Sequence, residues 1–148
     1  MSKIIKLKIL TPEKIVYQDE VLEITLPTES GEITILSQHA PLVSIVKTGE
    51  IRIKKQDNNE VIPFAISTGV VEIRSSDESE KMDTEVIILA SRTESSSDID
   101  IDRAQEAYKR AEKAMQEAEN LLDVDYAKLQ AVLEKELNRI NIAKKWRK

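Results

Sequence analysis

The residues that interrupt regular structure are confined to one part of this chain. All three glycines and all four prolines of its 148 residues lie before position 70, and the rest of the chain contains neither. Glycine and proline mark turns, and both disfavour the interior of helices. The first part therefore has to contain many turns, whereas the second part can form long helices.

Apolar and polar residues alternate in the first part. The alternation is clearest over 5–9, 22–26 and 50–54, and a two-residue period is typical of half-buried strands. Further short apolar runs follow at intervals of about 8–12 residues, as in antiparallel sandwiches and barrels. We therefore predict an antiparallel β-sandwich or barrel over residues 1–90, with 75–84 as the tip of a hairpin. These further runs are 33–36, 42–46, 61–66, 70–73 and 86–89.

A helical period begins after a serine-rich segment, 91–98, which we interpret as a linker. Two apolar stripes with steps of three and four residues predict an antiparallel hairpin of two helices over 99–148, and hence an α+β fold. The first stripe is mostly alanine, and each buried alanine contributes only about 0.8 kcal/mol, against about 1.5–3 kcal/mol for leucine. We therefore expect a weakly held hairpin. The stripes are Ala104, Ala107, Ala111, Ala114 and Ala118, and then Tyr126, Leu129, Leu133, Leu137 and Ile140.

Composition excludes several classes of function. The chain has no cysteine and one histidine, so we expect no disulfide, no thiol nucleophile and no metal site. With 22 Lys+Arg against 27 Asp+Glu the net charge is −5, which argues against nucleic acid as a partner. There is no apolar run of about 18 residues and no signal-peptide pattern, so we expect a soluble, cytosolic-side protein.

Four short segments narrow the function further. They read SGEITIL and HAPL (30–36 and 39–42), KTGEIR (47–52), STGVVE (67–72) and IDIDRA (99–104). In their order and spacing the chain resembles the epsilon subunit of bacterial F-type ATP synthase over nearly its whole length. It departs from the family pattern at Thr34, 37–38 and Thr68, and in a longer 75–84 tip.

The resemblance implies both an architecture and a task. The architecture is a sandwich of about ten strands followed by the helical hairpin. The implied task is that of a non-catalytic central-stalk subunit, which couples proton-driven rotation to ATP synthesis and inhibits ATP hydrolysis through mobile helices. The implied partners are the gamma subunit, the rotor ring and the catalytic beta and alpha subunits. The implied location is the cytoplasmic face of the cell membrane, where the subunit is peripheral and not inserted.

The resemblance also assigns residues to two surfaces and one ligand. Glu32 and His39 are expected to face the rotor ring. No cofactor is required, but regulatory ATP is expected to bind the folded-down hairpin, at a site where Lys135 stands in place of the arginine usual in the family. This replacement exchanges the planar guanidinium group of arginine, which can bind a phosphate through two N–H groups at once, for the compact charge of a lysine ammonium group. The expected ATP site comprises Glu94, Ile99, Asp100, Arg103, Ala104, Lys135 and Arg139.

Simpler structural interpretations compete with these assignments. Asp100 stands where it can cap the first helix and pair with Arg103. The cations near the C-terminus can be a solvated helix end stabilised by the helix dipole, although the resemblance implies that they contact an acidic segment of the catalytic head, with Trp146 as an apolar anchor. These cations are Arg139, Lys144, Lys145, Arg147 and Lys148.

Two other functions fit the same sequence. One is a stand-alone nucleotide-sensing module whose hairpin closes over its ligand and reports it to an unrelated partner. The other is an enzyme that uses Asp98 and Asp100 as paired carboxylates, but no second catalytic motif accompanies them. There is no glycine-rich phosphate loop either, so we expect no ATP hydrolysis by this chain alone.

Overall fold

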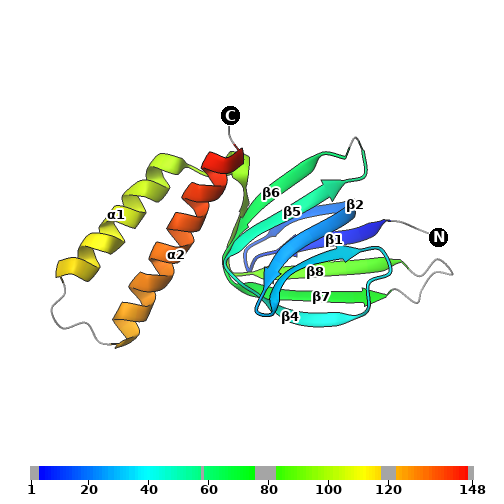
Figure 1. The fold of residues 1–148 in the computed structure, drawn as a ribbon, viewed down its shortest axis with the longest axis horizontal. Helices are drawn as coiled ribbons and strands as arrows, with labels where there is room; N and C mark the ends of the chain where they lie inside the picture. Colours follow the sequence, from blue (N-terminus) through cyan, green and yellow to red (C-terminus); the bar gives the residue numbers. More distant parts are fainter. Residues whose placement is uncertain (1–3, 58, 76–82, 118–122, 147–148) are drawn as a thin grey trace. The chain divides into compact units, whose positions relative to one another are not determined.

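The chain folds into two compact units, Met1–Ser95 and Ser96–Lys148. A computed structural model describes residues 4–57, 59–75, 83–117 and 123–146 (Figure 1). The first unit is built of strands and the second of helices, as the distribution of glycine and proline predicts.

The strand unit contains nine strands among the described residues. They form one continuous hydrogen-bonded sheet that folds into two layers (Figure 1), which confirms the predicted sandwich. The strands are β1 (Ile5–Leu10), β2 (Ile15–Thr28), β3 (Gly31–Leu36), β4 (Leu42–Val46), β5 (Gly49–Lys55), β6 (Val61–Ile66), β7 (Gly69–Ser75), β8 (Thr84–Ala90) and β9 (Thr93–Ser95).

The long strand β2 belongs to both layers. Its first half pairs with β1, and its second half pairs with β3 and β5. Strands β4, β7 and β8 complete the layer of β1, and strands β6 and β9 complete the layer of β5. The pairing of β1 with β8 is parallel, whereas the other strand pairings among the described residues are antiparallel, as predicted. The short connections that favour antiparallel pairing do not join these two strands.

The core lies between the two layers. Buried and less buried residues alternate along β1, where Ile5, Leu7 and Ile9 point inward, as the two-residue period predicts. At the margin of this core the ring of Tyr17 meets Phe64 edge-on, with ring centroids 5.4 Å apart. Each fully buried aliphatic side chain, such as that of Leu7, contributes about 1.5–3 kcal/mol to the free energy of folding.

The end of the strand unit differs from the expected boundary at Ala90. β9 pairs with the end of β6, with Phe64 opposite Ser95 and Ile66 opposite Thr93, and a short 3-10 helix, η1 (Ser96–Asp98), follows. The expected linker 91–98 thus contains regular structure, because its backbone finds partners on a free sheet edge. The expected hairpin 75–84 has Ser75 paired with Thr84, and 76–82 lie outside the described residues.

The helical unit consists of α1 (Ile101–Glu117) and α2 (Asp123–Trp146), which pack against each other. This confirms the predicted two-helix hairpin. On α1 the buried residues are Ala104 and Ala111. Ala114 is exposed, so the alanine stripe is shorter than predicted, and Ala118 lies outside the described residues.

The buried face of α2 differs from the predicted stripe. Ile140 is buried, but Tyr126 and Leu137 are exposed, so their assignment to the stripe is wrong. In their place Glu136 and Arg139 are buried together with Ile142 and Ala143. This buried pair of opposite charges has no counterpart in the stripe read from the sequence.

Candidate functional site

Asp100 caps the first turn of α1. Its Oδ1 accepts a hydrogen bond from the backbone N–H of Arg103 at 3.1 Å, and its carbonyl accepts the N–H of Ala104 at 3.0 Å. This confirms the capping interpretation. The side chains of Asp100 and Arg103 are both exposed, and no ion pair joins them in the part of the chain that the structure describes.

Three charged side chains meet on α2. The Arg139 Nη1 atom lies 2.7 Å from Glu136 Oε2, and the Lys135 Nζ atom lies 3.5 Å from Glu136 Oε1. The side chains of Arg139 and Glu136 are only 7% and 4% exposed, whereas that of Lys135 is 30% exposed. The two cations expected to bind ATP are therefore bridged by a carboxylate that our sequence analysis missed.

A sequence signal for this cluster exists. Glu136 and Arg139 are three residues apart, a spacing at which helical side chains are neighbours and opposite charges attract. The apolar stripe concealed the pair, because it placed Leu137 on the buried face.

The other expected ATP-site residues lie in different surroundings. Ile99 and Ala104 are fully buried, so their side chains serve packing. Arg103 is exposed on the first turn of α1. Glu94 belongs to the strand unit, where it lies on β9 opposite Ala65.

The cations expected at the C-terminal end do not form one exposed run. Lys144 and Lys145 are exposed, and the Lys145 Nζ atom lies 5.3 Å from the centre of the half-buried Trp146 ring. Arg139, by contrast, is buried against Glu136. Its expected contact with the catalytic head stays a prediction. Arg147 and Lys148 lie outside the described residues.

The two residues expected to face the rotor ring lie at opposite ends of β3. Glu32, near its start, forms an ion pair with Arg52 at 3.0 Å. His39 follows its end, where the backbone N–H donates to Leu36 and Nδ1 lies 2.7 Å from the Ala40 carbonyl oxygen. A strand rises about 3.3 Å per residue, so the structure does not bring these two side chains together.

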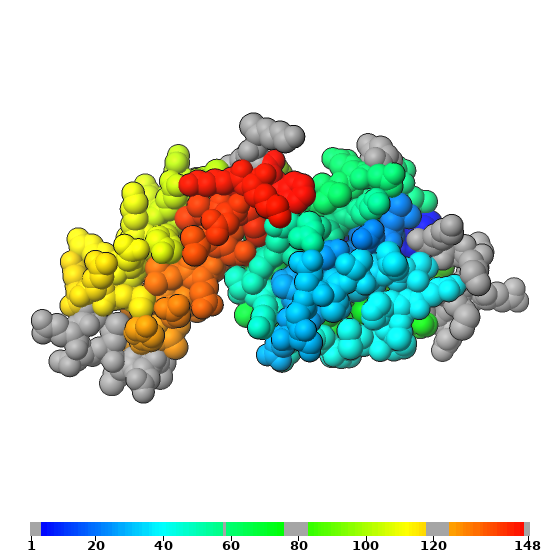
Figure 2. Space-filling view, viewed as in Figure 1, coloured from blue at the N-terminus to red at the C-terminus, as the bar shows by residue number. Residues whose placement is uncertain are grey.

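An exposed apolar row crosses three strands. Ile45 of β4 lies opposite Val70 of β7, which lies opposite Leu89 of β8, and all three are 40–53% exposed. We call these three residues the apolar row. Figure 2 shows β4, in cyan, at the surface of the strand unit. A partial sequence signal was the unbroken apolar run 86–90 in β8, since such a run puts apolar side chains on both faces of a strand.

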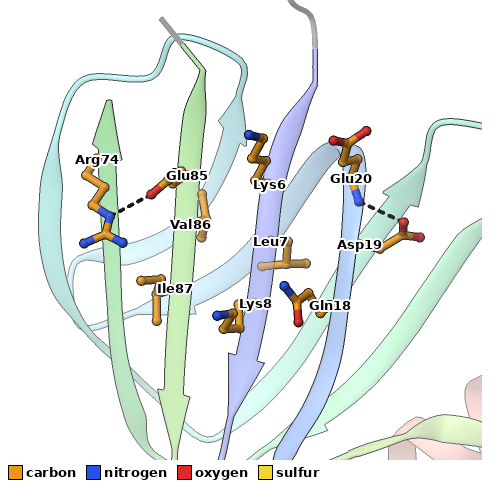
Figure 3. A pocket seen from close by; sticks show the side chains of 10 residues that line it. All are labelled: Lys6, Leu7, Lys8, Gln18, Asp19, Glu20, Arg74, Glu85, Val86 and Ile87. Atoms are coloured by element: carbon orange, nitrogen blue, oxygen red, sulfur yellow. Dashed lines mark hydrogen bonds and ion pairs between the residues drawn. The ribbon is translucent and has the colours of Figure 1, made fainter. Parts of the chain in front are cut away.

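A groove of about 440 Å³ lies on the same outer face, over β2, β1, β8 and β7 (Figure 3). Arg74 lies 2.9 Å from Glu85, and Lys6 lies 3.4 Å from Asp83. Both signs of charge line the groove, so it favours no single class of small ligand. It forms a charged border beside the apolar row.

Neither a cluster of metal ligands nor a membrane-spanning helix occurs in the described residues. Among the residues that the structure covers, no three His, Cys, Asp or Glu side chains gather closely enough to hold a metal ion. No helix in the described ranges is both long and apolar enough to cross a membrane.

Known proteins match the chain along both units. The family model for the ATP synthase delta/epsilon chain β-sandwich domain matches residues 4–96, and that for its long α-helix domain matches residues 97–144. The ATP synthase epsilon chain of Desulforamulus reducens is 34% identical over 143 residues, covering 97% of this chain and 99% of the relative. That of Bacillus pumilus is 38% identical, with the same coverage.

Solved structures show the same fold. A chain of the Euglena gracilis mitochondrial ATP synthase, in an assembly of OSCP, F1 and c-ring, superposes with a TM-score of 0.73 at 18% identity, covering 93% of this chain and 80% of that one. A chain of the Tetrahymena thermophila enzyme, from its central stalk and c-ring, gives 0.55 at 15% identity, with 95% and 94% covered. With both family models matched in order and relatives aligned over nearly their whole length, the chain belongs to the ATP synthase epsilon chains.

Proposed function

We propose that this chain works in the rotating central stalk of an F-type ATP synthase, where it couples rotation to ATP synthesis and restrains ATP hydrolysis. As an epsilon chain it is a non-catalytic subunit. The observation that carries the regulatory part is the thin packing of the helical unit, in which α1 buries only two alanines among its described residues. An element held this weakly can change its conformation at low free-energy cost.

The apolar row is the proposed docking surface for the gamma subunit. Exposed apolar residues that lie together on a sheet mark interaction surfaces. The charged groove beside the row supplies the polar border that protein interfaces have around an apolar centre. Opposite charges in this border fix the orientation of the partner more than they add affinity.

Contacts with the rotor ring are assigned to Glu32 and His39. Glu32 already pairs with Arg52, so a basic residue of the ring would compete with Arg52 for the same carboxylate. Binding to the ring would hold the chain as a peripheral subunit at the cytoplasmic face of the cell membrane.

Inhibition is assigned to the C-terminal end of α2. Lys144 and Lys145 are exposed cations beside a half-buried Trp146, a combination suited to an acidic surface of the catalytic beta and alpha subunits. Attraction of this kind acts within a screening length of about 8 Å at physiological salt.

Regulatory ATP is assigned to the helical unit, with Arg103, Lys135 and Arg139 as phosphate-binding residues and Asp100 at the start of α1. By mass action, a ligand at about 100 times its dissociation constant stabilises the state that binds it by roughly 2.7 kcal/mol. That free energy is large compared with the contribution of the two alanines that α1 buries, which is about 0.8 kcal/mol each.

The test is the ATPase rate of the assembled catalytic head with the full chain and with residues 1–95. We expect the full chain to lower the rate and the truncated chain to leave it high, while both bind gamma. Equal rates would remove the inhibitory role. A strand unit that does not bind gamma would instead favour the stand-alone nucleotide-sensing module.

A further inference from the structure

We propose that Glu136 acts as an internal substitute for a phosphate group at Arg139, and thereby sets how strongly the helical unit depends on ATP. This inference rests on the ATP site proposed above. It concerns a residue that the expected site does not include.

The geometry places the Glu136 carboxylate where an anion would bind. Its Oε2 atom lies 2.7 Å from Arg139 Nη1 and its Oε1 atom lies 3.5 Å from Lys135 Nζ. Both oxygens thus face the two cations assigned to the phosphates. The Arg139 and Glu136 side chains are more than nine-tenths buried, so little water screens their interaction.

Carboxylate and phosphate oxygens make the same kind of contact with a guanidinium group. Both accept short, charge-assisted hydrogen bonds, and arginine binds either one through its planar fork. A phosphate group approaching Arg139 therefore competes with Glu136 for the N–H groups. It also meets a buried negative charge, whose repulsion is stronger than it would be in water.

The pair also explains how the helical unit holds a buried arginine without nucleotide. Removing one partner of a buried ion pair is strongly destabilising, because the other charge stays buried without compensation. Glu136 supplies this compensation from within α2. It should therefore raise the stability of the ATP-free helical unit and lower its affinity for ATP at the same time.

A purely structural role for Glu136 makes a different prediction. If the carboxylate only holds α2 together, its loss lowers the melting temperature with and without ATP alike, and ATP binds no more tightly. The change in ATP affinity is therefore the measurement that separates the two roles.

The experiment compares the full chain with its Glu136→Gln and Glu134→Gln variants. Glutamine keeps an oxygen that can accept from Arg139 but removes the charge. Glu134 is exposed on the same helix and controls for the change in net charge. ATP affinity is measured by calorimetry, and unfolding of the helical unit by the fluorescence of the single tryptophan, Trp146.

We expect Glu136→Gln to melt at a lower temperature without ATP and to bind ATP about tenfold more tightly or better, with Glu134→Gln unchanged. Tripolyphosphate, which lacks the adenosine, should show the same order of affinities. Adding Arg139→Gln to Glu136→Gln should remove the gain. If Glu136→Gln loses helix content, Glu136→Asp, whose carboxylate is one methylene shorter, should shift affinity in the same direction.

Two results would overturn the inference, and they are distinguishable. If the wild-type chain binds ATP and Glu136→Gln binds it equally or less tightly, Glu136 is not a competitor but the ATP site stands. If neither chain binds ATP or tripolyphosphate, the proposed ATP site fails and the inference fails with it.

Discussion

At the scale of single residues, Asp100 performs one measurable task, since its carboxylate accepts the N–H of Arg103 at the start of α1. Replacing an N-cap aspartate by alanine costs about 0.5–2 kcal/mol, whereas asparagine caps equally well. We expect Asp100→Ala to lower the stability of the helical unit by about 1 kcal/mol, measured by thermal unfolding, and Asp100→Asn to leave it unchanged. Equal losses in both variants would show that the charge, and not the cap, is what matters.

Tyr17 makes the strand unit sensitive to alkaline pH. Burial, reinforced by the nearby Asp19 carboxylate, raises the pKa of Tyr17 to about 12, against about 10 in the unfolded chain. Between pH 10 and 12 the unfolded chain therefore releases this proton first, so the free energy of unfolding falls as pH rises. Urea unfolding at pH 8 to 11 should show a smaller alkaline loss for Tyr17→Phe. Parallel curves for both proteins would remove Tyr17 as a cause.

The roles of single residues could be predicted from the sequence where they depend on neighbours along the chain. They could not be predicted where a charged neighbour in the folded structure changes which side chains are buried. The Asp100 cap follows from sequence, because an aspartate before a helix has few other local tasks. The burial of Glu136 does not, since a lone glutamate is placed on the solvent side of an amphipathic helix. Two neighbouring cations reverse that preference and leave Leu137 exposed.

At the scale of elements, the strands of the sandwich follow from periodicity, but its last strand does not. The three residues of β9 (Thr93–Ser95) are polar and carry no apolar alternation. They are ordered by backbone pairing with β6, which composition does not report. The apolar row was equally hidden, because each strand contributes a single residue to it and only the register aligns them.

The contribution of β9 can be measured by comparing two fragments. We expect residues 1–95 to fold cooperatively as a β protein and residues 1–90 to be less stable. The difference comes from the backbone hydrogen bonds between β9 and β6, each worth about 0.5–1.5 kcal/mol. Circular dichroism with urea unfolding gives both free energies. Equal stabilities would mean that β9 is an appendage, and an unfolded 1–95 fragment would contradict the division into two units.

At the scale of the whole molecule, two valines of nearly equal exposure test the proposed docking of gamma. Val70, in the apolar row, is 40% exposed, and Val61, on β6, is 39% exposed. We expect Val70→Ser to weaken gamma binding by about 1 kcal/mol or more and Val61→Ser to leave it unchanged, measured by calorimetry. Melting temperatures control for folding. Equal affinities of both variants for gamma would place the docking surface elsewhere.

The parallel pairing of β1 with β8 has a consequence for how the protein folds during its synthesis on the ribosome. Ile5 pairs with Thr84 and Leu10 with Leu89. Because β1 is synthesised well before β8, its second edge stays unpaired until β8 has left the ribosome. Contacts this distant along a chain form slowly, and translation at about 5–20 residues per second sets the earliest moment. Until then β1 has only β2 as a neighbour and keeps an open edge. The helices, whose contacts are local, close soon after their own synthesis.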